Sequence, residues 1–321
     1  MNTIDLIRVK SKITLHGLVY LGVLVSLFQT SVKWMRQKLF YVRREIIHKL
    51  AGHSEDQEIK KPKVSVAIVH ITSTEEATDP EQGKIKIERL HQTIDGLLGS
   101  FAHCQLRITI ITMANRNIVT FLPQYQQRFI EIREITDGDP MLIGFPAQEE
   151  LFSQIDDFDW FLFIEDDIVL RDSFLLEKLE QFNQNCGCNN AILLPNRYEL
   201  YEGVKNYIDF TIDETLAWNK VSVLNIHGVK FAEWTNPHSG LYCLSQAQMQ
   251  LWQQSGRQWG NRDLGFGGPR ESAATFCLLE CFSVYKPHFS NLNFLEVEHY
   301  DSKYSMLYSN SSLYRLVPKK I

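Results

Sequence analysis

The sequence lacks a strong charge of either sign and lacks the short motifs of several common enzyme classes. It has 321 residues, a formal net charge of -5 and a pI near 6.1, which gives no sign of a nucleic-acid partner. No Gly-Lys-Ser/Thr phosphate loop occurs, and the glycines of 265–268 lack the spacing of a dinucleotide-binding motif. His238-Ser239-Gly240 lacks the flanking glycine pattern of a hydrolase nucleophile elbow. These absences argue against phosphate-loop, dinucleotide-binding and serine-hydrolase enzymes.

Cysteine is scarce and shows no recognisable framework. The chain has six cysteines, and Cys186-Gly187-Cys188 is too tightly spaced for the usual zinc-binding pair and has no matching second pair. Cys277 and Cys281 fall one turn apart on a predicted helix, where free thiols often serve as small core residues. We therefore expect reduced thiols, which favours a cytosolic setting for the main part of the chain.

Charge is also missing from one long stretch near the amino end. Residues 13–32 contain no Asp, Glu, Lys or Arg, and a run of about 20 such residues can span a bilayer as a helix. Cations interleaved with bulky apolar residues follow over 33–49, a pattern typical of a helix on an anionic membrane surface. The sequence therefore predicts a membrane anchor over 1–50, either a single-pass span or an interfacial helix. Because more cations follow the run than precede it, the main domain is expected to be cytoplasmic rather than luminal.

Beyond a polar linker over 51–61, predicted strands and helices alternate. This alternation predicts an α/β fold with a mostly parallel central sheet flanked by helices. We assign 62–300 to one domain and 301–321 to a polar tail. The strands are predicted over 64–71, 106–113, 130–135 and 160–164, and the helices over 85–98, 121–129 and 147–155.

The second half is less regular. Residues 197–236 are rich in aromatics and show no clear period, and 256–268 form a glycine-rich loop. A helix behind Pro269 is expected over 270–279. The other elements expected are helices over 172–182 and 246–254 and strands over 191–195 and 239–245.

The most informative stretch joins a buried strand to three acids. Five apolar residues from Trp160 run into Glu165-Asp166-Asp167, and three adjacent carboxylates would raise one another's pKa unless a cation balanced them. Magnesium and manganese take carboxylate oxygens and complete their shell with substrate phosphates. Because open α/β sheets bind ligands at the carboxyl ends of their strands, the pattern predicts a metal–diphosphate site. The alternative is a solvated acidic loop.

This stretch resembles the acidic metal motif of glycosyltransferases with the GT-A fold, in the Glu-Asp-Asp variant of the DxD motif found in some N-acetylglucosaminyltransferases. In those enzymes too a hydrophobic strand ends in the triplet, an aliphatic residue follows, and a helix begins with Asp or Pro and an aromatic residue. Here Ile168 follows the triplet, and Asp172-Ser173-Phe174 precedes the predicted helix. The resemblance in organisation covers 62–300, although only the triplet and its flanks match a motif.

The resemblance implies a nucleotide-sugar donor whose diphosphate is bridged to the protein by Mn²⁺ or Mg²⁺. Asp167 would then bind the metal, while Asp166 and Glu165 would face the donor sugar, the ribose or coordinated waters. His299 is the candidate for a late histidine that also binds the metal, with an ordinary surface or core histidine as the alternative. Further nucleotide contacts are expected where the first two strands end, although loop ends are polar in any case. These contacts are His70, Thr72, Asn115 and Arg116.

Inverting enzymes of this kind place an Asp or Glu under the acceptor as general base, at the start of a helix. Glu271 is the first candidate and Asp263 the second, with compensation of the helix dipole as the alternative role of Glu271. The sequence thus predicts a metal-dependent, inverting glycosyltransferase that moves a hexosyl or N-acetylhexosaminyl group to a glycan, lipid or cell-surface precursor. The alternative is a catalytically silent sugar- or metal-binding module on the same fold.

Overall fold

The computed structural model describes residues 60–210, 222–233, 237–256 and 268–309. The chain divides into two compact units after Lys60, and the elements below belong to the unit that begins at Lys61. The predicted anchor over 1–50, nearly all of the predicted linker, and Asp263 lie outside the described residues.

The predicted membrane localisation needs correction. Within the described ranges, no helix is long and apolar enough to cross a membrane. The longest helix there, α3 (Lys84–Ser100), has 17 residues, fewer than the roughly 20 that a span needs, and it carries charged residues such as Lys86 and Arg89. This finding contradicts the membrane prediction, and the apolar run over 13–32 on which that prediction rested lies outside the described residues.

The predicted mostly parallel central sheet is confirmed. Its strand order is β11-β4-β1-β2-β3, with β1 to β4 paired in parallel and β11 antiparallel to β4. The register sets Val69 beside both Ile111 and Glu165, so the carboxyl ends of three neighbouring strands lie level. The strands are β1 (Lys63–Val69), β2 (Gln105–Met113), β3 (Ile130–Ile135), β4 (Trp160–Glu165) and β11 (Leu241–Ser245).

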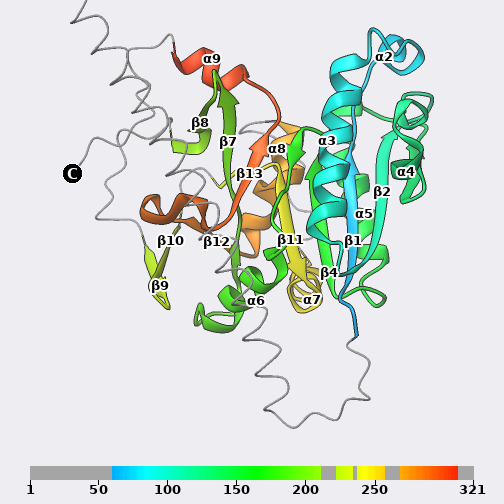
Figure 1. Cartoon of the computed structure of the whole chain (residues 1–321). Coiled ribbons are helices and arrows are strands. Elements are labelled where there is room, and N and C mark those ends of the chain that lie inside the picture. The colour runs from blue at the N-terminus through cyan, green and yellow to red at the C-terminus, as the bar shows by residue number, and fades with distance from the viewer. Residues whose placement is uncertain (1–59, 211–221, 234–236, 257–267, 310–321) are drawn as a thin grey trace, which may run out of the picture. The chain divides into compact units, whose positions relative to one another are not determined.

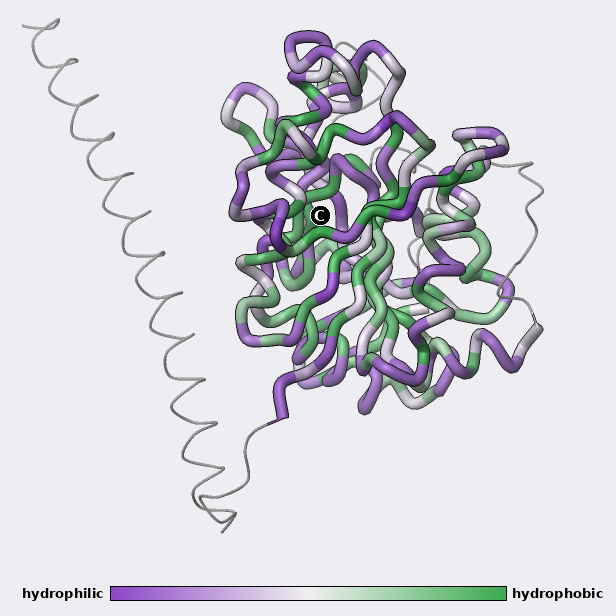
Figure 2. The backbone as a smooth tube through the Cα atoms, turned by 90° about the vertical axis from the view of Figure 1, so that its right-hand side faces the viewer, coloured by the Kyte–Doolittle hydropathy of each residue, from purple (hydrophilic) through white to green (hydrophobic). Residues whose placement is uncertain are grey.

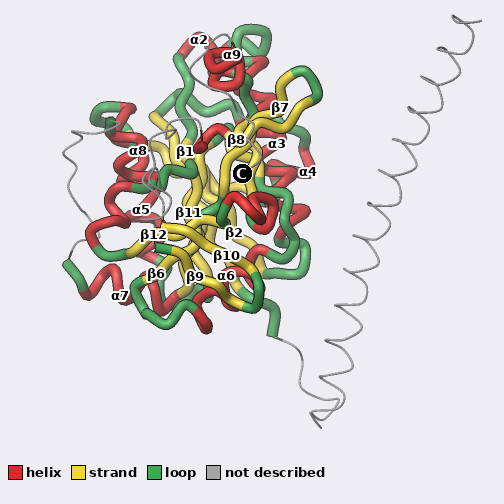
Figure 3. Tube along the Cα trace, turned by 90° about the vertical axis from the view of Figure 1, so that its left-hand side faces the viewer, coloured by secondary structure: helices red, strands yellow, loops and turns green. Residues whose placement is uncertain are grey.

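Helices flank both faces of this sheet, as Figures 1 and 3 show. Alternate residues of a strand point to opposite faces, so Val66 and Ile68 of β1 share one buried cluster with Leu90 of α3. Ala67, between them, belongs to a second cluster with Leu151 of α5. In Figure 2 the hydrophobic segments run through the interior of this unit. The other α-helices in the described part of the chain are α2 (Thr74–Thr78), α4 (Gln124–Gln127), α5 (Gly144–Ser153), α6 (Leu175–Asn185), α7 (Gln246–Gln254), α8 (Pro269–Ala274) and α9 (Lys303–Ser309).

Two small sheets occupy the part of the chain that the sequence left irregular. Their orders are β6-β12-β10-β9 and β5-β13-β7-β8. The hairpin turns escaped detection because Glu202-Gly203 and His227-Gly228 reach positive φ with residues other than the usual Asn-Gly or Asp-Gly. The strands are β5 (Ile168–Val169), β6 (Ala191–Leu193), β7 (Asn196–Tyr201), β8 (Val204–Tyr207), β9 (Val223–Ile226), β10 (Val229–Glu233), β12 (Ser283–Pro287) and β13 (Glu296–His299).

The helix predicted over 270–279 is broken. At Thr275 the backbone adopts φ -153° and ψ -54°, so α8 ends at Ala274 and a 3₁₀ helix follows over Phe276–Glu280. The fully buried Thr275 lies 3.1 Å from His238 through its hydroxyl, a tertiary contact that a helical period does not reveal. The structure also places α9 in the stretch predicted to be a polar tail.

Candidate active site

The acidic triplet lies at the carboxyl edge of the central sheet. Strand β4 ends at Glu165 and β5 begins at Ile168, so Asp166 and Asp167 occupy the turn between the two sheets. Strand β13 runs antiparallel to β5 and sets His299 opposite Ile168. The backbone N–H of Tyr300 donates to the carbonyl of Asp167 at 2.7 Å. The late histidine predicted from the sequence is therefore brought next to the triplet.

The three acids have different surroundings. Burial and the nearby charge of Asp167 raise the pKa of Glu165. Burial alone would raise the pKa of Asp166, but His70 and Lys86 lower it; their nitrogens lie 2.7 and 3.6 Å from its Oδ2. Burial and the charge of Asp166 raise the pKa of Asp167. Asp166 is thus stabilised as an anion by the protein itself, whereas the anionic forms of Glu165 and Asp167 are disfavoured, a cost that a bound cation would offset.

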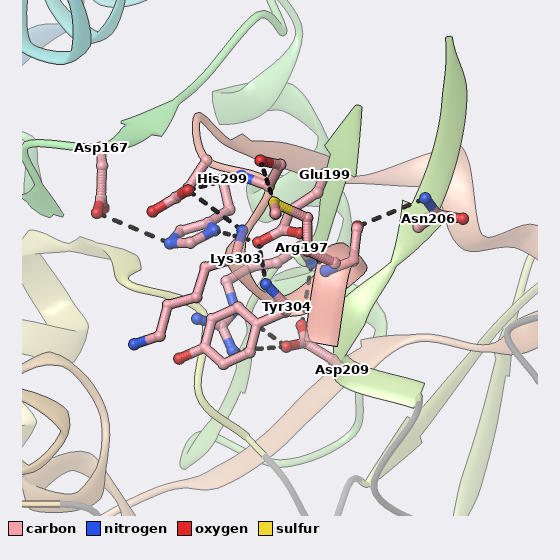
Figure 4. A network of polar contacts seen from close by, with 12 residues as sticks. Asp167, Arg197, Glu199, Asn206, Asp209, His299, Lys303 and Tyr304 are labelled. Atoms are coloured by element: carbon pink, nitrogen blue, oxygen red, sulfur yellow. Dashed lines mark hydrogen bonds and ion pairs between the residues drawn. The ribbon is translucent and has the colours of Figure 1, made fainter. Parts of the chain in front are cut away.

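Asp167 and His299 face each other, and a third residue fixes the histidine. His299 Nε2 lies 3.7 Å from Asp167 Oδ2, while His299 Nδ1 lies 2.8 Å from Glu199 Oε1 (Figure 4). Histidines that bind metals usually donate their other ring N–H to a carboxylate or a carbonyl. Glu199 is fully buried, so the arrangement leaves Nε2 directed toward Asp167.

The spacing of these two side chains suits a shared ion. Two atoms that each lie about 2.1 Å from one ion are about 3 Å apart at a right angle and about 4 Å apart when opposite. The observed 3.7 Å falls within that range. Within the described ranges, no group of three or more His, Cys, Asp or Glu side chains is arranged to hold a metal. Asp167 and His299 offer one carboxylate and one imidazole donor, a pair that would suit a divalent ion only together with ligands from outside the protein.

A small cavity adjoins the triplet and is lined by two positively charged side chains. Its volume is about 50 Å³, and Lys86 and Arg270 line it together with all three acids. The charge of Arg270 opposes the rise in the pKa of Glu165. Neither cation was singled out in the sequence, because each lies on a helix far along the chain from the triplet.

Helix α8 carries Glu271 to the same place. A Cβ added at Gly144 of α5 would come within 2.5 Å of the Ala273 Cβ, so the absence of a side chain there lets α8 pack directly on α5. Glu271 is half-buried, and its charge is close enough to raise the pKa of Glu165. The structure thus brings Glu271 and the triplet together, while Asp263 lies outside the described residues.

The predicted nucleotide contacts divide into two groups. His70 is fully buried behind Asp166, so it supports the triplet from inside. Thr72 and Thr112 both donate hydroxyl hydrogen bonds to the Arg116 carbonyl, at 2.5 and 3.0 Å. Asn115 is exposed with a φ of 59°, and like Arg116 it follows β2, two strands from β4. Their contact with a nucleotide stays a prediction.

A buried charge cluster lies behind the site. Asp209 accepts hydrogen bonds from Arg197 Nε and Nη2 at 2.9 and 2.8 Å and from Lys286 Nζ at 2.8 Å. Burial alone would raise the pKa of Asp209, but the charges and hydrogen bonds of Arg197 and Lys286 lower it to about 2. With two cations and one carboxylate the cluster is positive, and the charge of Arg197 reaches Glu165, where it opposes the rise in the pKa.

A larger groove is lined by residues of α3, β7 and β13 and by the segment that follows β13. Its volume is about 650 Å³, and Arg89 and Tyr300 line it together with Ile85 and Leu200. The last two are 67% and 52% exposed, and they add apolar surface to a lining in which most residues are charged. Tyr300 connects it to the site, because its backbone N–H bonds Asp167.

Comparison with known proteins finds little. No protein-family model matches the chain, and a search of curated proteins finds no match. Similar solved structures include the galactosyltransferase LgtC in complex with donor and acceptor sugar analogues, at 12% identity over 69% of this chain and 72% of that one, with a TM-score of 0.33. An active-site mutant of LgtC gives the same identity and coverage with a TM-score of 0.32. TarS from S. aureus is 9% identical over 76% of this chain and 62% of that one, with a TM-score of 0.40. At these values the functional argument rests on the site itself.

Proposed function

We propose that the protein is a metal-dependent, inverting glycosyltransferase of the GT-A type. It moves a hexosyl or N-acetylhexosaminyl group from a nucleotide-sugar donor to a glycan, a lipid or a cell-surface precursor. The observation that carries this proposal is the pair of Asp167 and His299, 3.7 Å apart at the carboxyl edge of a parallel sheet, with Glu199 holding the histidine. An acidic loop on an ordinary surface has no need of a buried carboxylate to orient a neighbouring histidine.

Asp167 and His299 would hold Mn²⁺ or Mg²⁺, for which the carboxylate and imidazole donors are suited. An ion bound there supplies positive charge to the diphosphate as it leaves. Lys86 and Arg270 line the adjoining cavity and add to the positive charge available to phosphate oxygens. Asp166, fixed by His70, would accept hydrogen bonds from the hydroxyls of the donor sugar or the ribose.

Glu271 is proposed as the general base. An acceptor hydroxyl oxygen forms a bond to the anomeric carbon of the donor, on the face opposite the diphosphate. The bond from that carbon to the phosphate oxygen breaks, and the nucleoside diphosphate leaves with the electron pair. The hydroxyl proton passes to the Glu271 carboxylate. The groove of about 650 Å³ lined by Tyr300 falls within the usual size of ligand sites. Because the Tyr300 backbone N–H bonds Asp167, this groove is the proposed place for the acceptor.

The test is a transfer and donor-hydrolysis assay over UDP-, GDP- and CMP-sugars with Mn²⁺. CMP-sugars carry no diphosphate, so no turnover is expected with them. Turnover is expected with one donor class, and Asp167→Asn is expected to reduce it at least 100-fold, because charge stabilisation at a leaving group contributes on that order. Asp157→Asn changes a similar but exposed aspartate and is expected to leave turnover unchanged. Equal turnover by wild type and Asp167→Asn would contradict the proposal. Metal-dependent donor binding without any turnover would instead favour the catalytically silent module.

A further inference from the structure

One buried carboxylate joins two elements of the site. Glu199 of β7 is fully buried and lies one hundred positions from His299 in the chain. Its Oε1 lies 2.8 Å from His299 Nδ1 and accepts the Tyr304 backbone N–H at 3.3 Å, and its Oε2 accepts the Ser305 N–H at 2.6 Å. Tyr304 and Ser305 belong to the first turn of α9, where backbone N–H groups have no partner within the helix. Glu199 therefore links His299 to the start of α9.

The hydrogen bonds of Glu199 determine which ring nitrogen of His299 donates to it. Both carboxylate oxygens accept backbone N–H groups of α9, which can only donate, so Glu199 acts as an ionised carboxylate does. An ionised carboxylate can only accept hydrogen bonds. His299 must then donate from Nδ1, and in the neutral ring the lone pair of Nε2 faces Asp167.

Helix α9 borders the site through Tyr304. The Tyr304 ring lies 5.5 Å from the His299 ring and 6.0 Å from the Arg197 guanidinium carbon. In Figure 4 the side chains of Tyr304 and Lys303 end on the left of the view, where Asp167 and the His299 nitrogen that faces it also lie. The stretch that the sequence suggested was a polar tail thus supplies one wall of the site.

We propose that Glu199 is a positioning residue with two tasks: it fixes the tautomer of His299 so that Nε2 can bind a metal, and it holds α9 so that Tyr304 lines the site. This inference rests on the proposed function, because it concerns the same metal site. It goes further by making the metal-binding competence of His299 depend on a residue that touches neither metal nor substrate. Substituting an amide for the carboxylate keeps the shape but offers an N–H₂ group where Nδ1–H donates, which favours the opposite tautomer.

The first experiment reads the tautomer directly and needs no metal. Long-range ¹H–¹⁵N NMR of the full chain labelled with [¹⁵N]histidine distinguishes Nδ1–H from Nε2–H rings, and His299→Gln identifies the His299 signals by their loss. The wild type is expected to show Nδ1–H, and Glu199→Gln is expected to shift His299 toward Nε2–H. A wild-type His299 that carries its proton on Nε2 would overturn the inference, even if Glu199→Gln failed to fold.

The second experiment measures Mn²⁺ binding to the full chain by electron paramagnetic resonance. Loss of an outer-shell partner usually weakens metal binding about 10- to 100-fold, and Glu199→Gln is expected to fall in that range. Glu296→Gln is the matched control, since Glu296 bonds Lys205 and Tyr207 instead, and it should bind as the wild type does. Equal binding by wild type and Glu199→Gln would refute the role of Glu199. If even the wild type bound no Mn²⁺, the metal site of the proposed function would fail, whereas the tautomer result would still decide the orienting role.

Discussion

Neighbouring acids in this chain have different surroundings, and those surroundings suggest different roles. Asp166 is bonded to His70 and lies near Lys86, so its charge is balanced within the protein. Asp167 faces His299 and shares a cavity with Arg270. The sequence could place all three acids at a strand end, and the resemblance could assign the metal to Asp167. The physical basis for that difference could not be predicted, because the partners that distinguish the acids come from α3, β13 and α8.

The first residue-scale prediction concerns Glu271. Glu271→Gln removes the proposed proton acceptor while keeping the size and most hydrogen bonds of the side chain. Transfer is expected to fall by about 100- to 10,000-fold, with the affinity for the donor unchanged in a nucleotide-binding titration. Glu280→Gln alters an exposed acid just beyond the same region and should have no effect. Undiminished transfer by Glu271→Gln would remove Glu271 from the role of base.

The buried cluster gives a prediction about stability. Asp209→Asn leaves Arg197 and Lys286 without their counter-charge, and breaking a buried pair in this way costs about 3–5 kcal/mol. Lys286→Met instead removes one of the two cations and leaves Arg197 bonded to Asp209, so a much smaller loss is expected. Urea unfolding at pH 7 would measure both. A smaller loss for Asp209→Asn than for Lys286→Met would contradict this account.

The same cluster predicts the direction of a pH effect. The folded-state pKa of Asp209 is about 2, below its ordinary value near 3.9. Its contribution to stability is therefore fully present above about pH 4 and is lost as the pH falls toward 2. The difference in unfolding free energy between wild type and Asp209→Asn should shrink over that interval.

At the scale of elements, the position of α8 depends on a missing side chain. A Cβ at Gly144 would come within 2.5 Å of Ala273 and 3.6 Å of Phe163, so Gly144→Val is expected to push α8, and with it Arg270 and Glu271, away from the triplet. Transfer should fall at least 10-fold, while Mn²⁺ binding by Asp167 and His299 should change little.

The control for this change is Gly99→Ala. A Cβ at Gly99 meets nothing within 4 Å, and alanine in a helix interior is up to about 1 kcal/mol more favourable than glycine. Activity should be kept and stability slightly raised, as thermal unfolding would show. Full activity of Gly144→Val would contradict the claim that transfer depends on the close packing of α8 against Gly144.

How far the sequence predicts the elements depends on their length and period. The alternating first half, from β1 to β4, could be read from runs of β-branched residues and helical spacing. The helix that follows Pro269 is shorter than predicted, because Thr275 leaves the helical conformation and contacts His238. The hairpin of β7 and β8 was missed because its strands are only 6 and 4 residues long and its turn uses Glu202.

At the scale of the whole molecule, the candidate site draws on distant parts of the chain. The triplet, Glu199, Glu271 and His299 come from β4, β7, α8 and β13, and only the triplet carried a local signal. His299 and Glu271 could be proposed by resemblance, whereas Glu199 could not, because its role depends on the parallel pairing of β7 with β13. Such strand pairings position the residues of the site, and they cannot be predicted from any short segment of the sequence.

The most direct test of the account is to locate the ion. Crystals grown with Mn²⁺ and a nucleoside diphosphate would show manganese by its anomalous scattering. We expect a single strong peak about 2 Å from both an Asp167 carboxylate oxygen and His299 Nε2, with phosphate oxygens completing the shell. Manganese bound elsewhere, or a nucleotide bound with no ion between it and Asp167, would contradict the central claim.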